Sequence, residues 1–214
     1  MRISSVLLTI LFVSVFSFAT AQDLITCGFK LGAIQATQER TYSPQSLIQS
    51  SGTNVIWGWD AGVFLRHSLN RNVALAVELH YLQRGRSVTV MATVLSVNPQ
   101  GFVDLGPVEI KERSHHLSVP ILAQFRIDYD KIVPYVALGP RIEYMLLRPE
   151  SVSYDQFKRW EFGGTITAGI QVSPGFIPEM LVEVAYNTNF TDAYSNQYVT
   201  ITNRSFSFLV GVIF

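Results

Sequence analysis

Cysteine and charge are what this sequence has least of. One cysteine occurs among 214 residues, which excludes a disulfide framework and a cysteine-built metal site. Charged residues make up 15%, against about a quarter in average soluble domains. The charges of the 16 basic and 16 acidic residues cancel, so the chain lacks the net positive charge typical of nucleic-acid-binding proteins. No nucleic acid is therefore expected as a partner. Apolar residues, at 48%, exclude a disordered chain.

The first 21 residues have the order of a secretory signal peptide. Arg2 gives a positive start, an apolar run follows from Val6 to Phe18, and small residues occupy Ala19 to Ala21. The run is too short to remain in a bilayer as a spanning helix. We expect cleavage before Gln22, which leaves residues 22–214 as one domain; the alternative is a buried N-terminal strand or helix.

After residue 22, apolar and polar residues alternate with a period of two, and no long helical stripe occurs. The alternation predicts eight strands, at residues 24–34, 55–66, 73–84, 115–127, 133–146, 160–172, 180–188 and 204–214. The connections 35–54, 85–114, 147–159 and 189–203 are long, whereas 67–72, 128–132 and 173–179 are short and contain turn residues. Long loops at one end and short turns at the other are typical of outer-membrane barrels. We therefore expect an all-β fold, an eight-stranded antiparallel up-and-down transmembrane β-barrel.

The connection 85–114 has a pattern of its own. Val88, Val90, Ala92 and Val94 alternate with other residues, and Asn98 to Gly101 is a strong turn signal. We expect the third and fourth strands to continue past the membrane as a long hairpin; the alternative is an irregular loop.

The two faces of the expected strands differ in charge. One face is apolar and carries no charged residue on any strand. The other face carries five bases and five acids: Lys30, Arg66, Arg84, Arg126, Arg141, Asp60, Glu78, Glu143, Glu161 and Glu183. Unpaired charges inside a soluble barrel would cost several kcal/mol each, so the apolar face should meet lipid and the charges should pair in the lumen. The equal numbers predict a packed polar lumen with an ion-pair network and no open pore. Three of the arginines, Arg66, Arg84 and Arg126, lie near strand ends, and the alternative for them is that water solvates their side chains.

Two parts of the sequence resemble known outer-membrane patterns. The last strand, Arg204 to Phe214, resembles the C-terminal signal read by the barrel-insertion machinery, with outward residues Phe206, Phe208, Val210, Val212 and Phe214. Residues 116–126, HLSVPILAQFR, and residues 134–140, PYVALGP, resemble two consecutive strands of the PorT-like outer-membrane beta-barrel family. Ser118 stands where many relatives carry an acid. The resemblance implies a Gram-negative outer membrane, and the family's best-known members assist protein secretion.

Catalytic chemistry has weak support in the sequence. His116 and Ser118 share a strand face, and Glu112 or Glu143 could orient the histidine, which defines a lipid-directed hydrolase as one alternative. His80 is read as a hydrogen-bonding group of the lumen. Adjacent His115 and His116 point to opposite faces of a strand, so they do not form a metal site together. No cofactor and no metal are expected.

The leading hypothesis is a non-enzymatic outer-membrane barrel that acts through its external loops in adhesion, structure, secretion or assembly. Its expected partners are outer-membrane lipid, the barrel-insertion machinery and a protein that docks on the loops. A soluble, lipocalin-like carrier barrel is a further alternative, and a narrow pore is the last.

Overall fold

A computed structural model of the chain describes residues 25–42, 55–95, 102–147, 158–175, 178–195 and 199–214. The expected signal peptide, residues 1–21, and the hairpin turn Asn98 to Gly101 lie outside the described residues. Within the described part of the chain, no helix is long and apolar enough to cross a membrane.

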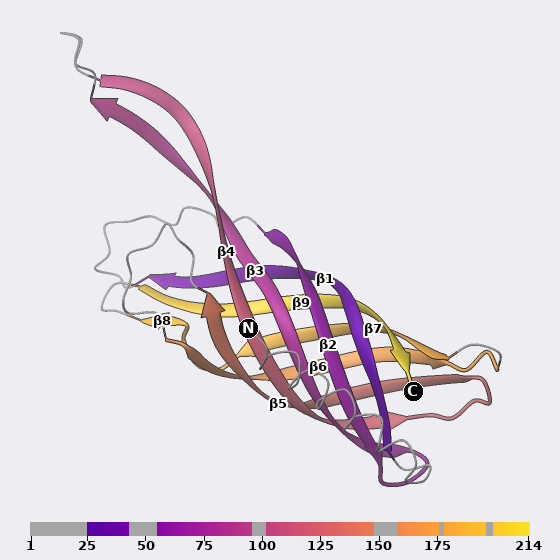
Figure 1. Ribbon diagram of the computed structural model, residues 1–214. Coiled ribbons are helices and arrows are strands. Elements are labelled where there is room, and N and C mark those ends of the chain that lie inside the picture. Colours follow the sequence, from indigo (N-terminus) through magenta and orange to yellow (C-terminus); the bar gives the residue numbers. More distant parts are fainter. Residues whose placement is uncertain (1–24, 43–54, 96–101, 148–157, 176–177, 196–198) are drawn as a thin grey trace, which may run out of the picture.

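The described residues form one closed antiparallel sheet (Figure 1). Its strands are β1 (Ile25–Tyr42), β2 (Ile56–Ser68), β3 (Val73–Leu95), β4 (Phe102–Arg126), β5 (Ile132–Leu147), β6 (Trp160–Val172), β7 (Glu179–Asn189), β8 (Tyr194–Ser195) and β9 (Val199–Ile213). Each of the long strands pairs with the next, and β9 pairs with both β7 and β1, which closes the barrel. β8 is a two-residue strand that pairs only with β9. The barrel proper therefore has eight strands in up-and-down order, and the expected fold class is confirmed.

The barrel wall is apolar outside and polar inside. Leu75, Ile121 and Val210 expose 43%, 43% and 55% of their surface, although all three are apolar residues within strands of the wall. Asp60, Arg141 and Glu143 expose 2% or less. An apolar exterior suits lipid, and closure leaves no unpaired strand edge in the bilayer. The charged interior contradicts the carrier-barrel alternative, because such a barrel needs an apolar cavity for its ligand.

Two strands are longer than the alternation predicts. β1 continues to Tyr42 and β9 begins at Val199, and the two extensions pair with each other, from Thr37 opposite Arg204 to Tyr42 opposite Val199. These residues are mostly polar on both faces, so no period-two pattern marks them. Backbone hydrogen bonds between the first and last strands extend the sheet there without an apolar face.

The short connections are tight turns. Asn70 Oδ1 accepts hydrogen bonds from the backbone N–H groups of Asn72 and Val73, at 2.9 and 2.8 Å. Asp130 has a φ of 49° and Gly175 a φ of 86°, values that turn residues such as Asp and Gly tolerate. Local side-chain and backbone chemistry thus ends the strands at this end of the barrel.

The hairpin predicted for residues 85–114 is confirmed. β3 and β4 stay paired from Gly85 opposite Arg113 to Leu95 opposite Phe102, with one register shift between Met91 and Thr93. Figure 1 shows this ribbon projecting far beyond the rest of the barrel. We call residues 86–95 and 102–113 the ribbon.

Candidate functional site: a charged lumen below a projecting ribbon

Lys30 of β1 joins two carboxylates across the lumen. Its Nζ lies 2.8 Å from Glu78 Oε1 of β3 and 2.7 Å from Glu183 Oε2 of β7. Tyr135 of β5 donates its hydroxyl hydrogen to the same Glu183 oxygen at 2.6 Å. All four side chains are buried, so the contact ties together strands that are not neighbours in the sheet.

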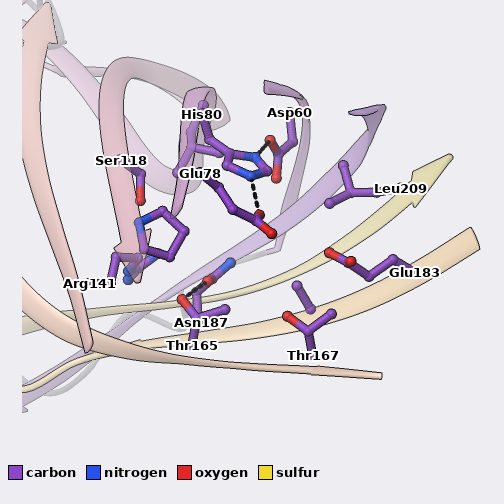
Figure 2. A pocket seen from close by; sticks show the side chains of 13 residues that line it. Asp60, Glu78, His80, Ser118, Arg141, Thr165, Thr167, Glu183, Asn187 and Leu209 are labelled. Atoms are coloured by element: carbon purple, nitrogen blue, oxygen red, sulfur yellow. Dashed lines mark hydrogen bonds and ion pairs between the residues drawn. The ribbon is translucent and has the colours of Figure 1, made fainter. Parts of the chain in front are cut away.

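His80 lies between two further carboxylate oxygens (Figure 2). Its Nδ1 is 2.6 Å from Asp60 Oδ1 and its Nε2 is 2.8 Å from Glu78 Oε2. An ionised carboxylate can only accept, so both ring nitrogens donate and the ring is an imidazolium. With Lys30, Arg66, Arg84 and Arg141, His80 supplies a fifth buried cation for the five buried acids Asp60, Glu78, Glu143, Glu161 and Glu183. We call Lys30, Asp60, Glu78, His80, Tyr135 and Glu183 the Lys30 cluster.

Glycines make room for the larger members of the lumen. Gly62 pairs directly with His80, and a Cβ at Gly62 would lie 2.7 Å from His80 Nδ1. Gly169 pairs with Tyr135, and a Cβ there would lie 2.6 Å from the tyrosine oxygen. A small residue opposite a large one therefore lets each ring lie across the neighbouring strand.

A second group, here called the Glu143 cluster, consists of Arg84, His116, Arg141, Glu143 and Glu161. Glu143 of β5 is approached by Arg84 Nη1 at 2.7 Å, by Arg141 Nη1 at 3.2 Å and by His116 Nδ1 at 2.8 Å. Glu161 of β6, which pairs directly with Glu143, accepts hydrogen bonds from the amides of Asn189 and Asn203. The Asn189 amide also accepts from Arg141, which links the two carboxylates to one guanidinium.

The lumen is nearly full. The larger cavity has a volume of about 20 Å³ and is lined by Asp60, His80, Ser118, Arg141 and Thr167 among others (Figure 2). The second has about 10 Å³ and lies beside Lys30, Phe64 and Tyr135. A water molecule needs roughly 10–15 Å³ by this measure, so the lumen between these side chains has space for single waters.

The ten predicted lumen charges do not all take part in the network. Nine are buried, and eight of them belong to the two clusters. Arg66 is the ninth: it donates to Thr26 Oγ1 at 3.0 Å and to Gln171 Oε1 at 2.9 Å. Arg126 is the last residue of β4 and therefore lies at the short-turn rim of the barrel. There it donates hydrogen bonds to Ser68 Oγ and to the carbonyl oxygen of Arg71. Its assignment to the lumen network is therefore corrected.

Several uncharged residues take part in the lumen network although this role was not predicted for them from the sequence. Tyr135 and the amides of Asn189 and Asn203 hold carboxylates, and Asn187 accepts a hydrogen bond from Thr165. For Tyr135, Asn187 and Asn189 the signal was present, since each has an apolar or aromatic neighbour on the opposite face, but the pattern gives the face and not the partner. Asn203 lies between Thr202 and Arg204 and has no such signal.

The expected insertion-signal residues lie on the lipid face of β9 and at its end. Phe206, Phe208, Val210 and Phe214 expose 45%, 46%, 55% and 68% of their surface. Aromatic pairs Trp59–Tyr81, Tyr144–Trp160 and Tyr186–Phe206 lie toward the long-loop end, with ring centroids 4.7–4.8 Å apart. This placement fits an aromatic girdle at a membrane interface; recognition of the C-terminal strand by the insertion machinery stays a prediction.

The side chains of His116, Glu143 and Glu161 are the closest to a metal site in the described residues. One ligand atom from each lies within 4.8 Å of the others. However, Arg84 and Arg141 already balance the two carboxylates, so a divalent ion would leave this buried cluster with a net positive charge. The electrostatics of the cluster therefore do not favour a metal.

The pairing of His116 with Ser118, considered from the sequence, is not the one formed. His116 Nε2 lies 2.9 Å from Ser114 Oγ, on the other side of the histidine along β4. Ser118 lines the larger cavity instead. Of the two candidate orienting acids, Glu143 is in contact with His116.

The fold has well-defined structural relatives. OprG from Pseudomonas aeruginosa superposes with a TM-score of 0.52 at 9% identity, over 90% of this chain and 97% of that one. Neisserial surface protein A gives a TM-score of 0.52 at 11% identity, over 88% and 96% of the two chains. At such identities the likeness shows the fold alone. Among curated proteins, none matches the sequence.

A family model described as outer membrane protein beta-barrel domain matches residues 20–195, which is most of the chain. Together with the lipid-facing exterior and the barrel relatives, this match supports a location in a Gram-negative outer membrane. The chain belongs to the outer membrane protein beta-barrel domain family.

Proposed function

We propose that this barrel is a docking protein, and that its ribbon binds an extended segment of a partner protein by adding a strand. The observation that carries the proposal is the pairing of the ribbon. β2 pairs with β3 only as far as Leu82, and β5 pairs with β4 only as far as His115. Beyond these points, among the described residues, β3 and β4 pair only with each other.

From Val88 outward, neither edge of the ribbon pairs with another described strand. Each edge is a row of backbone N–H and C=O groups that can pair with another strand. The eight residues from Val88 to Leu95 span about 26 Å at roughly 3.3 Å per residue, long enough for a strand of ordinary length. A two-stranded hairpin is only marginally stable by itself, so an added strand stabilises it.

The register also gives the ribbon two unlike faces. Val88 pairs with Ile110 and Val90 with Val108, and these apolar pairs alternate with polar pairs such as Thr89 with Glu109. Below Gly85 the even-numbered positions of β3 face the lumen and include the polar residues Glu78, His80 and Arg84, whereas the even-numbered positions 88 to 94 of the ribbon are all apolar. This inversion fits a segment in water with one apolar face, and the partner it suits is an extended segment of alternating apolar and polar residues.

A finer family assignment supports the same proposal. The residues that resemble the PorT-like family, 116–126 and 134–140, lie on the paired strands β4 and β5, with Pro120 opposite Arg141. We assign the chain to that branch, whose best-known members assist protein secretion. An accessory role in secretion or assembly at the cell surface is consistent with a docking ribbon.

Site-specific photo-crosslinking in intact cells tests the docking proposal. A photoreactive residue at Thr93 of the ribbon is expected to give a discrete protein adduct, and the same residue at lipid-facing Leu31 is expected to give none. Proline at Thr89 and proline at Val90 form a matched pair, because successive residues direct their N–H groups to opposite sides. One of the two removes an edge donor and should abolish the adduct. The absence of any ribbon adduct, or an adduct indifferent to both prolines, would contradict the proposal.

A further inference from the structure

Three side chains at the ribbon end of the lumen form a chain of contacts that the docking function does not use. Ser114 Oγ lies 2.9 Å from His116 Nε2, and His116 Nδ1 lies 2.8 Å from Glu143 Oε1. Ser114 and His116 are two residues apart on β4, so they share its lumen face, and Glu143 is on the adjacent strand β5. A hydroxyl, an imidazole and a carboxylate in this order are the nucleophile, base and orienting group of acyl-transfer chemistry.

The environment of His116 fixes the direction of its hydrogen bonds. A ring nitrogen close to an ionised carboxylate carries the hydrogen, so we assign the tautomer with the hydrogen on Nδ1, in which Nε2 can accept. The Ser114 hydroxyl therefore donates to Nε2. Nδ1 makes no hydrogen bond with good geometry among the described residues, although Glu143 Oε1 is 2.8 Å away, and such contacts commonly tighten only when substrate binds.

From this geometry we propose that Ser114 is an activated nucleophile, and that the ribbon end of the lumen hydrolyses carboxylic esters with small acyl groups. The proposal goes beyond the docking function and does not depend on it. Small esters are the expected class because Ser114 is only 8% exposed, so a bulky acyl group could not reach its hydroxyl.

The neighbouring arginines suit the same chemistry. Arg84 pairs directly with Ser114 across β3 and β4, and its Nη1 holds Glu143 at 2.7 Å. Its Nε and Nη2 are buried and have no hydrogen-bond partner among the described residues. Buried donors without a partner are costly, and a negative oxygen that develops on a substrate carbonyl beside Ser114 would satisfy them.

Burial decreases along the chain of contacts toward the serine. Glu143 and His116 are each 1% exposed, whereas Ser114 is 8% exposed. The nucleophile is thus the member nearest to solvent, at the point where β3 and β4 leave the barrel. A substrate would approach from the ribbon end and not through the lumen.

The reaction needs only the ester and water. Ser114 Oγ attacks the carbonyl carbon as its proton passes to His116 Nε2, and the C–O bond to the alcohol breaks as His116 returns that proton to the leaving oxygen. Water then attacks the carbonyl carbon of the acyl-serine and gives a proton to His116 Nε2. His116 passes this proton to Ser114 Oγ as the bond between Oγ and the acyl carbon breaks and the carboxylic acid leaves. Glu143 acts through His116 as a positioning residue.

The test uses the folded full-length barrel in detergent, with a fluorophosphonate probe and p-nitrophenyl acetate. The probe is expected to label the parent on the peptide containing Ser114, and Ser114→Ala should lose the label and at least about 100-fold of the esterase rate, since a general base contributes about 10²–10⁴-fold. Ser118→Ala, on the other side of His116, is the matched control and should keep both. A heat-modifiability gel shows that each variant is folded.

Two further variants separate chemistry from structure. His116→Gln should abolish labelling. Glu143→Gln should lower kcat and leave KM unchanged, because in the described part of the chain the ion pairs of Glu143 are with the histidine and the two arginines. An unlabelled folded parent, or a label that survives Ser114→Ala, would overturn the proposal without affecting the ribbon.

Discussion

Replacing Lys30 by methionine tests whether the lumen network holds the barrel together. The substitution keeps the length of the side chain but removes the charge that contacts Glu78 at 2.8 Å and Glu183 at 2.7 Å. Removing one partner of a buried ion pair costs about 3–5 kcal/mol, because the other charge stays buried without compensation.

The two carboxylates would be affected unequally. Glu78 keeps the imidazolium of His80 at 2.8 Å, whereas among the described residues Glu183 keeps the hydroxyl of Tyr135, at 2.6 Å, as its hydrogen-bond donor. Most of the loss should therefore come from Glu183, and we expect the single variant to lose about 3 kcal/mol of unfolding free energy. The double variant Lys30→Met with Glu183→Gln removes the stranded charge and should recover at least about 1 kcal/mol, as coupled neighbours do.

Equilibrium urea unfolding in lipid vesicles, followed by tryptophan fluorescence and by the gel shift of the folded barrel, measures these differences. Arg71→Met, at an exposed turn, is the control and should change the unfolding free energy by no more than about 0.5 kcal/mol. The reasoning is refuted if Lys30→Met costs no more than the control, or if adding Glu183→Gln makes the protein still less stable.

Three further expectations follow from the wall and the lumen. Val210→Arg puts a charge on the lipid face of β9 midway between Phe206 and Phe214, and should cost roughly 2–4 kcal/mol in the same unfolding assay; Arg204→Lys serves as a mild comparison, and equal stability of the two variants would be incompatible with a lipid-facing Val210. Gly62→Ala should lose about 1–3 kcal/mol, because its Cβ would lie 2.7 Å from His80 Nδ1 and force the ring away from Asp60; a variant as stable as the parent would mean that the ring has room to move. Planar bilayers with the purified barrel should show no steady conductance, since the larger lumen cavity holds about 20 Å³, and single-channel steps would disprove a packed lumen.

The alternation of residues was enough to predict the barrel wall. β6 has the predicted bounds, Trp160–Val172, and β5 and β7 differ from their predictions by one residue at each end, because apolar residues mark one face of each strand throughout. The extension of β1 to Tyr42 was missed because both of its faces are polar there. The ribbon was predicted because Val88, Val90, Ala92 and Val94 restore the alternation beyond the membrane.

The candidate site was predicted less well, for a geometrical reason. A strand pattern assigns a residue to the lumen, but its partner depends on register and on which strands face each other across the barrel. Lys30 meets Glu183 because β9 closes against both β1 and β7, a contact 153 residues apart in the chain. The choice between Ser114 and Ser118 as the partner of His116 likewise depends on side-chain rotamers, which no spacing rule contains.

Closure of the sheet by β1 and β9 constrains how the molecule can be made. The first and last strands pair over 15 positions, from Gly28 with Ile213 to Tyr42 with Val199. Until the final strand arrives, β1 and β7 each have a free edge, and no intermediate that lacks β9 can present a seamless surface to hydrocarbon. Insertion should therefore be a late, all-or-none event, and a chain truncated before Val199 should remain in the periplasm as a substrate for proteolysis.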